Sequence, residues 1–303
     1  MNKIELIPHS ILDERHQLVL FVKNTAKELN LQFGWHYILD IVWILDQIER
    51  QSIPKGSVIL DAGAGNGIVQ FCLSRLGYKI ISVDFGPRNP GYNITKYFKI
   101  DNLMNNNTGF DHKYLNHKKN SFSTSPNLTK IMYDFIKKGI LSLLPILQDF
   151  FSQRPRPEIT YYKADLQNME LIVSDSIDAV ISVSVIEHNS EAEVVKIMKE
   201  LKRILKKNAP MFITTSASGR EDWFHQPSHG WAYSESTIRE IFLSSDSKYQ
   251  SNYGLYDEMM EQLVKSQELK YSLSPMYFKS GDNGMPWGKW DPQYYPVGIV
   301  NSK

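Results

Sequence analysis

Val58-Ile-Leu-Asp-Ala-Gly-Ala-Gly-Asn-Gly67 joins a short apolar run, an acid and three alternating glycines. A helical pattern follows at once and ends at Gly77, and a second apolar run, Ile80–Val83, leads to Asp84. This order predicts a strand, a glycine turn, a helix and a second strand that ends in an acid. In a parallel sheet, the turn and the acid then lie together at the carboxyl ends of two strands, where open α/β sheets bind nucleotides. The stretch therefore predicts an α/β fold that holds the adenosine part of a cofactor.

The spacing of the glycines and the acid at Asp61 narrow the kind of cofactor. Glycine lacks Cβ, so Gly63, Gly65 and Gly67 permit positive φ angles and bring a ligand against bare backbone. Their Gly-x-Gly-x-Gly spacing differs from the Gly-x-Gly-x-x-Gly that cradles a pyrophosphate. A carboxylate at Asp61 repels a pyrophosphate and suits a ligand with an ammonium or sulfonium group. Asp84 is placed to accept hydrogen bonds from both ribose hydroxyls. The alternative interpretation is an ordinary tight turn between a strand and a helix.

The composition of this 303-residue chain is that of a globular protein, because 42% of its residues are apolar. The formal net charge is only +1, so no overall field favours nucleic acid, and we expect no nucleic-acid partner. The single cysteine, Cys72, excludes an intrachain disulfide and suits a reducing compartment. Its position on an apolar helix face predicts a small core residue.

No segment has the pattern of a signal peptide or a membrane span. Met1–Leu6 lacks the apolar stretch of a signal peptide. The longest apolar segments lie around Ile38–Leu45 and Ile140–Phe151, and both are too short to cross a bilayer. We therefore expect a soluble, cytoplasmic protein without a membrane partner. No pattern indicates an oligomeric state.

The chain is expected to form one domain over residues 1–303 with three added regions. Residues 1–53 are predicted to be helical, with an apolar stripe that runs from Ile38 to Ile48. Regular alternation stops after Asp84, and residues 86–157 predict an insertion, a polar loop followed by a helix from about Leu128 to Phe151, that serves as a lid or acceptor region. Residues 216–303 are expected to complete the acceptor region and the sheet.

Later segments predict the rest of the sheet. The parallel strands expected after the insertion are Ile159–Ala164, Ile177–Val183 and Met211–Thr215. Ser190 and Glu193 form a capping box for the helix between the last two of these strands. Leu269–Phe278 and Tyr295–Val300 are expected to pair as an antiparallel hairpin at a sheet edge.

With its glycine turn, its acids at strand ends and this order of strands and helices, the sequence resembles the class I S-adenosylmethionine-dependent methyltransferase superfamily. The resemblance covers about Pro54–Val83 and Ile159–Thr215, together with the closing hairpin. It implies a Rossmann-like, seven-stranded, mostly parallel sheet with helices on both faces, an antiparallel C-terminal hairpin and a helical or loop insertion. It also implies methyltransferase activity with S-adenosylmethionine as the cofactor.

The resemblance implies roles for residues at the strand ends. The glycine turn would hold the methionine part and the ribose, Asp84 the ribose hydroxyls, and Asp165 the adenine amino group beside Leu166. Aromatic residues near the N-terminus often cover the cofactor in this family. The cofactor-binding residues expected on this basis are Asp61, Gly63, Gly65, Gly67, Asp84, Asp165, Leu166, Val183, Trp35 and Tyr37. Asp165 has an alternative role as a helix N-cap, and Trp35 and Tyr37 have one in core packing.

Three histidines are the candidate catalytic residues. Glu187-His188 follows the fourth expected strand, where one branch of the family has a Glu-x-x-Glu-His pattern associated with a metal. Ser184 replaces the first Glu of that pattern, so we expect no metal. His188 can deprotonate an acceptor near neutral pH, or Glu187 and His188 can simply shape the turn. His225 and His229 follow the fifth strand, where the family builds acceptor pockets.

Aromatic residues gather in the same C-terminal region, and stacking on a planar or sugar acceptor and hairpin packing are both open to them. They are Trp223, Trp231, Tyr233, Trp287, Trp290, Tyr294 and Tyr295.

These features predict methyl transfer from S-adenosylmethionine to O or N of a small-molecule or saccharide acceptor. An oxygen acceptor needs a base, whereas an amine needs only deprotonation and positioning. One alternative is a nicotinamide-dependent oxidoreductase, against which the glycine spacing and Asp61 argue. The other is a cofactor-binding module without catalysis, against which the intact glycine turn argues. No motif names the acceptor.

Overall fold

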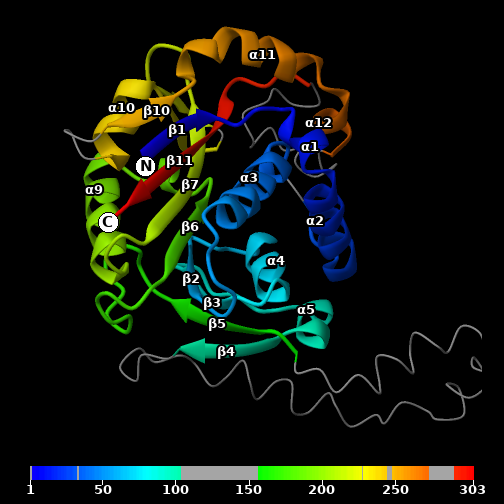
Figure 1. Cartoon of the computed structure of the whole chain (residues 1–303), viewed down its shortest axis with the longest axis vertical. Coiled ribbons are helices and arrows are strands. Elements are labelled where there is room, and N and C mark those ends of the chain that lie inside the picture. Colours follow the sequence, from blue (N-terminus) through cyan, green and yellow to red (C-terminus); the bar gives the residue numbers. More distant parts are fainter. Residues whose placement is uncertain (1, 33, 104–155, 227, 244–247, 273–289) are drawn as a thin grey trace, which may run out of the picture. The chain divides into compact units, whose positions relative to one another are not determined.

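The structure, a computed structural model, describes residues 2–32, 34–103, 156–226, 228–243, 248–272 and 290–303. Residues 1–103 and 157–303 form one compact unit. Its framework is a sheet of 11 strands (Figure 1). The helix expected at Leu128–Phe151, most of the expected insertion, and Trp287 lie outside the described residues.

Parallel strands make up the middle of the sheet. They are β2 (Val58–Ala62), β3 (Lys79–Asp84), β4 (Lys99–Leu103), β5 (Glu158–Lys163), β6 (Ala179–Val183) and β7 (Pro210–Ala217). Their order is β7-β6-β2-β3-β5-β4, and all neighbours are parallel. β6 and β7 are buried along almost their whole length, as expected for strands covered on both faces. β3 lies on one side of β2 and β6 on the other, so the crevice for a ligand opens at the carboxyl ends of β2 and β6.

The predicted antiparallel C-terminal strand is present, but its predicted place was wrong. β11 (Tyr295–Ser302) runs antiparallel to β7 and to β1 (Asn2–Leu6), so both of its sides are paired and it lies neither at a sheet edge nor in a hairpin with residues 269–278. The seven neighbouring strands from β11 to β4 form a mostly parallel sheet, as the resemblance implied. Additional strands extend it: β10 (Tyr249–Ser251) pairs with β1, β9 (Gly230–Tyr233) pairs with β7, and β8 (Trp223–His225) pairs with β9.

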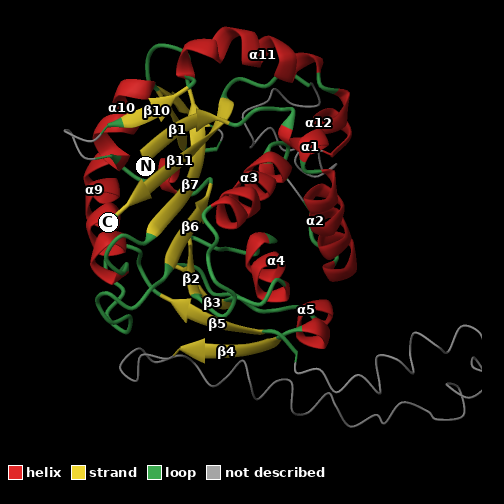
Figure 2. Cartoon of the chain, in the orientation of Figure 1, coloured by secondary structure: helices red, strands yellow, loops and turns green. Residues whose placement is uncertain are grey.

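Helices cover both faces of the sheet (Figure 2). On one side lie α2 (His16–Leu29), α3 (Tyr37–Arg50) and α4 (Val69–Arg75), and on the other α9 (Glu191–Ile204) and α10 (Glu235–Phe242). The capping box of α9 is confirmed, because the Ser190 N–H donates to Glu193 Oε2 at 2.8 Å. α3 packs on β6, β7 and β11. Gly298 of β11 permits this packing, since a Cβ there would lie 2.4 Å from the Trp43 ring. Smaller helices are α1 (Ile11–Glu14), α5 (Tyr92–Tyr97), α11 (Tyr256–Lys265) and α12 (Gln267–Ser272).

Three expectations about the elements were wrong. The N-terminal region opens with a strand, β1, before its helices begin. Residues 86–103 contain α5 and β4 and belong to the sheet unit, so the insertion starts later than expected. α12 occupies the start of the strand expected at Leu269–Phe278, whose remainder lies outside the described residues. β1 and β4 are short strands near the ends of the sheet, and their pairing partners are distant in sequence. The local pattern of apolar residues therefore does not show that they pair.

Candidate active site

The glycine turn after β2 is built by backbone hydrogen bonds to the neighbouring strand. The N–H groups of Gly63 and Ala64 both donate to the Val83 carbonyl at 2.9 Å. Gly63 has a φ of 74°, and a Cβ on it would lie 2.3 Å from Val185 Cγ1. Any other residue would be strained there and would collide with Val185. The turn therefore lies directly against the chain that leaves β6.

Asp84, at the end of β3, organises two backbone segments. Its Oδ2 accepts a 2.8 Å hydrogen bond from the Gly65 N–H, and its Oδ1 accepts a 2.7 Å bond from the Gly86 N–H. Two carboxylate oxygens have about four acceptor positions. The half-buried Asp84 thus retains capacity to accept from ligand hydroxyls.

Asp61 is a buried acid whose Oδ2 has no hydrogen-bond partner among the described residues. Burial raises the pKa of Asp61 from 3.8 to about 7, the Arg88 guanidinium lowers it, and Asp84 raises it further. Arg88 donates to the Ser82 hydroxyl and carbonyl oxygens and lies over the Tyr161 ring at 4.0 Å. An acid with an unsatisfied oxygen next to the glycine turn fits a cationic ligand.

The remaining residues expected to bind the cofactor lie at the same edge of the sheet. Asp165 and Leu166 follow β5, and Val183 is the last residue of β6. Asp165 does not cap a helix, since the next element is β6. Its Oδ1 instead accepts from the Gln167 N–H at 2.8 Å in a turn, and its side chain is exposed.

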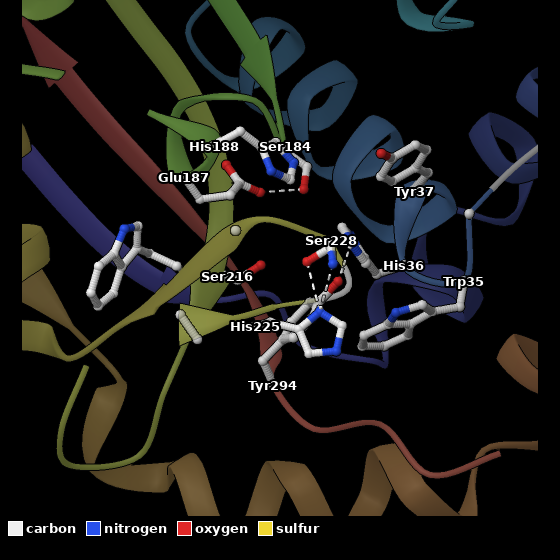
Figure 3. A pocket seen from close by; sticks show the side chains of 14 residues that line it. Trp35, His36, Tyr37, Ser184, Glu187, His188, Ser216, His225, Ser228 and Tyr294 are labelled. Carbon is white, nitrogen blue, oxygen red and sulfur yellow. Dashed lines mark hydrogen bonds between the residues drawn. The ribbon is translucent and has the colours of Figure 1, made fainter. Parts of the chain in front are cut away.

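A pocket opens beside the turn (Figure 3), with about 500 Å³ of empty space including its open mouth. Ser184, Glu187 and His188, on the chain that leaves β6, form part of its wall, close to Val185 and hence to the glycine turn. The other lining residues are Gly34, Trp35, His36, Tyr37, Ser216, His225, Ser228, Gly230, Trp231, Ala232 and Tyr294. The pocket therefore combines aromatic surface with several imidazoles and hydroxyls.

A family model described as a methyltransferase domain matches residues 42–246, which include β2, the glycine turn, β3, β5, β6 and β7. The chain belongs to this methyltransferase family. It is an S-adenosylmethionine-dependent methyltransferase, as the resemblance predicted.

Solved structures of other methyltransferases are similar to this chain. One is phosphoethanolamine N-methyltransferase 2 of Haemonchus contortus in complex with phosphomonomethylethanolamine and S-adenosylhomocysteine, 15% identical, covering 97% of this chain and 59% of that chain, with a TM-score of 0.45. Another is 1,6-didemethyltoxoflavin-N1-methyltransferase of Burkholderia thailandensis, 11% identical, covering 96% and 89%, with a TM-score of 0.41. A third is magnesium protoporphyrin IX methyltransferase of Synechocystis, 12% identical, covering 87% and 77%, with a TM-score of 0.38. No curated protein matches the sequence.

The three predicted catalytic histidines of the methyltransferase have different surroundings. His188 and His225 line the pocket, whereas His229 is not among its lining residues. The His188 Nδ1 lies 3.1 Å from the His229 carbonyl oxygen, so it donates there. The His225 Nδ1 lies 2.7 Å from Ser228 Oγ and accepts the Ser228 N–H at 3.3 Å. His225 Nε2 therefore carries the proton of the neutral ring.

Glu187 is a buried pocket acid held by two hydroxyls. It accepts from Ser184 Oγ and, at 3.2 Å, from Thr215 Oγ1. Burial raises the pKa of Glu187, and His188 and the hydrogen bond from Ser184 oppose that effect. Ser184 has a φ of 49°, a strained conformation of the kind found at functional sites.

Among the described residues, no group of three or more His, Cys, Asp or Glu side chains is arranged to hold a metal. Over the same described part of the chain, no helix is long and apolar enough to cross a membrane.

Sequence reasoning missed a second acid–imidazole pair in the pocket. His36 Nδ1 lies 2.5 Å from Asp40 Oδ2, and His36 Nε2 lies 3.3 Å from the Tyr294 hydroxyl. Trp35 and Tyr37, predicted to cover the cofactor, also line this pocket. The one sequence signal was the four-residue spacing of His36 and Asp40, which places both on one face of a helix.

Proposed function

We propose that this methyltransferase transfers a methyl group to O or N of a small-molecule or saccharide acceptor bound in the pocket of Figure 3. The observation that carries the proposal is the close packing of Gly63 against Val185. It brings the glycine turn next to the pocket wall formed by Ser184 and Glu187. Donor and acceptor sites thereby adjoin at the carboxyl ends of β2 and β6.

The residues proposed for the donor side belong to the ends of adjacent strands. We infer that the turn, with Asp61, Gly63, Gly65 and Gly67, holds the methionine part and the ribose. Asp84 accepts from the ribose hydroxyls with the acceptor capacity that Gly65 and Gly86 leave free. The adenine is proposed to lie at Asp165 and Leu166, and Val183 beside the sulfonium. The common edge of β2, β3, β5 and β6 supports this assignment.

When bound, S-adenosylmethionine supplies an electrophilic methyl group on a sulfonium. The chain's own residues would bind and orient the acceptor and exclude water. Tyr37, which begins α3, offers ring surface to a planar acceptor, whereas Trp35 is 0% exposed. His188 and His225 are the predicted proton-handling residues of this pocket.

The direct test is an acceptor screen with the purified full-length chain. Calorimetry with S-adenosylmethionine, and with NADH as the control ligand, establishes the donor first. A broad panel of metabolites, including sugars, is then incubated with the enzyme and S-adenosylmethionine, and methylated products are detected by mass spectrometry. We expect the enzyme to bind S-adenosylmethionine but not NADH, and the screen to yield a methylated small molecule. Binding of NADH in its place, or donor binding without any methylated product, would contradict the proposal.

A further inference from the structure

Three buried side chains form a hydrogen-bonded chain that ends at the pocket. Asp40 is 0% exposed, His36 3% and Tyr294 7%. The distances are 2.5 Å from Asp40 Oδ2 to His36 Nδ1 and 3.3 Å from His36 Nε2 to the Tyr294 hydroxyl. His36 and Tyr294 line the pocket, whereas Asp40 lies behind His36 in α3. Both pocket residues are labelled in Figure 3.

The direction of the hydrogen bonds follows from what each group can donate. A carboxylate only accepts, so His36 Nδ1 carries the proton and donates to Asp40. Nε2 of the neutral ring then has a lone pair, to which the Tyr294 hydroxyl donates. The side chains of Trp35 and Ser216 also hydrogen-bond to Tyr294. An indole N–H donates only, so the phenolic oxygen accepts from Trp35 while its own proton is directed at His36.

We propose that Tyr294, His36 and Asp40 are the proton relay of the methyl transfer, and that the acceptor is a hydroxyl group on a neutral, planar ring. This rests on the function proposed above. The acceptor hydroxyl takes the place of the Ser216 hydroxyl at the Tyr294 oxygen and gives its proton to that oxygen, and the Tyr294 proton moves to His36 Nε2. The acceptor oxygen bonds to the methyl carbon while the carbon–sulfur bond breaks, and the electron pair of that bond stays on sulfur. The imidazolium of His36 is stabilised by Asp40, which acts as a positioning residue.

Burial keeps the Tyr294 hydroxyl protonated before the reaction. It raises the pKa of Tyr294, and Glu187 adds to that effect. Tyr294 therefore keeps its proton at rest and passes one on only as it receives another. His36 differs in this respect from His225, whose Nδ1 accepts the Ser228 N–H, and from His188, whose partner is a backbone carbonyl. His36 has a carboxylate, that of Asp40, directly hydrogen-bonded to its ring.

The lining of the pocket favours a neutral hydroxyl acceptor. Among the described residues, those that line the pocket include no Lys or Arg and include the buried Glu187, so a phosphate or carboxylate acceptor would be repelled without compensation. A neutral amine attacks with its own lone pair, whereas a hydroxyl is a poor nucleophile until its proton is removed. Tyr37 and Trp231 supply the ring surface that a planar acceptor contacts.

The test compares matched acceptors on the full-length enzyme with saturating S-adenosylmethionine. Phenol is compared with aniline, and naphthol with naphthylamine. We expect methyl ethers from the hydroxyl series only. Tyr294→Phe, which keeps the ring, and His36→Gln should each lower kcat about 100-fold or more, with KM and the affinity for S-adenosylmethionine changed less than about threefold. His16→Gln, on the exposed face of α2, is the matched control and should retain wild-type kcat.

Two further readouts separate a relay from a structural role. The titratable groups facing His36 are Asp40, Tyr37, Tyr294 and Glu187, and a relay through His36 predicts that the pH profile of kcat differs between the wild type and His36→Gln. In nitrogen-15 NMR spectra of the enzyme without acceptor, His36 should carry its proton on Nδ1, and Tyr294→Phe should shift the Nε2 resonance.

Each contrary result overturns the relay in a distinguishable way. Methylation of amines alone, undiminished kcat in His36→Gln and Tyr294→Phe, or a proton on Nε2 would refute it while leaving a working methyltransferase. If S-adenosylmethionine binds and neither series is methylated, the planar hydroxyl class is wrong. If S-adenosylmethionine does not bind at all, the function proposed above fails first.

Discussion

The Gly65 N–H donates a 2.8 Å hydrogen bond to Asp84 Oδ2, which links the glycine turn after β2 to the acid at the end of β3. The second oxygen of Asp84 holds the Gly86 N–H at 2.7 Å. One carboxylate therefore shapes two loops at the ligand-binding edge of the sheet. Its remaining acceptor capacity is what the proposed role toward the ribose uses.

Asp84→Asn should weaken S-adenosylmethionine binding without unfolding the protein. The amide keeps the size of the side chain but places an NH₂ group against the N–H of Gly65 or Gly86, and it removes the charge that strengthens the ribose hydrogen bonds. We expect affinity to fall about 10- to 100-fold, or about 1.4 to 3 kcal/mol, in calorimetric titrations. Asp101→Asn, an exposed acid on β4 that pairs with Lys99, is the control and should bind normally. Equal affinity in both variants would exclude the role of Asp84.

Gly63→Ala should destabilise the fold as well as the donor site. The new Cβ would lie 2.3 Å from Val185 Cγ1 at a φ of 74°. Overpacking costs about 1–3 kcal/mol, and the left-handed conformation adds about 1 kcal/mol, so urea unfolding should show a loss of about 3 kcal/mol.

Val185→Ala in the same chain separates the two costs of Gly63→Ala. It removes the contacts of 2.3 and 2.8 Å with the Val185 methyl groups but leaves Val185 Cβ 2.9 Å from the added atom, so it should restore part of the lost stability. Gly254→Ala is the control, because nothing lies within 4 Å of the added atom. If the double variant is as unstable as Gly63→Ala, contact with Val185 is not the cause.

The glycine turn and the place of Asp84 beside it were predictable because they are local in sequence. The turn, its acid and Asp84 all fall within Val58–Asp84, and each residue type has a direct conformational or electrostatic reason. The pocket is different, because it gathers side chains from the start of α3, the ends of β6 and β7, the β8–β9 connection and the chain before β11. His36 and Tyr294 are 258 residues apart. No periodicity links them, so only the tertiary structure reveals their hydrogen bond.

Strand β1, which lies between β10 and β11, was missed for the same reason, and Asn252 provides a test of how its end is held. The Leu6 N–H donates to Asn252 Oδ1 at 2.7 Å, and Asn252 Nδ2 donates to the Leu6 carbonyl at 3.0 Å. Asn252→Ala leaves both backbone groups unpaired and should cost about 2 kcal/mol in urea unfolding. Asn252→Asp keeps the acceptor and should lose less. Asn168→Ala, at an exposed turn, is the control and should change stability by less than about 0.5 kcal/mol. A similar loss in both alanine variants would contradict this role.

Asp61 should make stability fall as the pH rises toward neutrality. Burial raises its folded-state pKa from 3.8 to about 7, so the folded chain keeps this proton over a pH range in which the unfolded chain has lost it. Between these two values, ionisation favours the unfolded state by about 1.4 kcal/mol for each pH unit. The full shift corresponds to a ceiling of about 4 kcal/mol. Above pH 7 both states are ionised, and the cost stays constant.

Asp61→Asn removes this ionisation, so its stability relative to the wild type should increase from pH 5 to pH 7 and then level off, whatever constant offset the amide introduces. Urea unfolding at pH 5, 6, 7 and 8 measures the difference. Asp13→Asn, on the exposed surface of α1, removes a carboxylate that is not buried and should follow the wild-type curve at every pH. A difference between Asp61→Asn and the wild type that is the same at all four pH values would mean that Asp61 is already ionised in the folded chain at pH 5, with its charge compensated by Arg88.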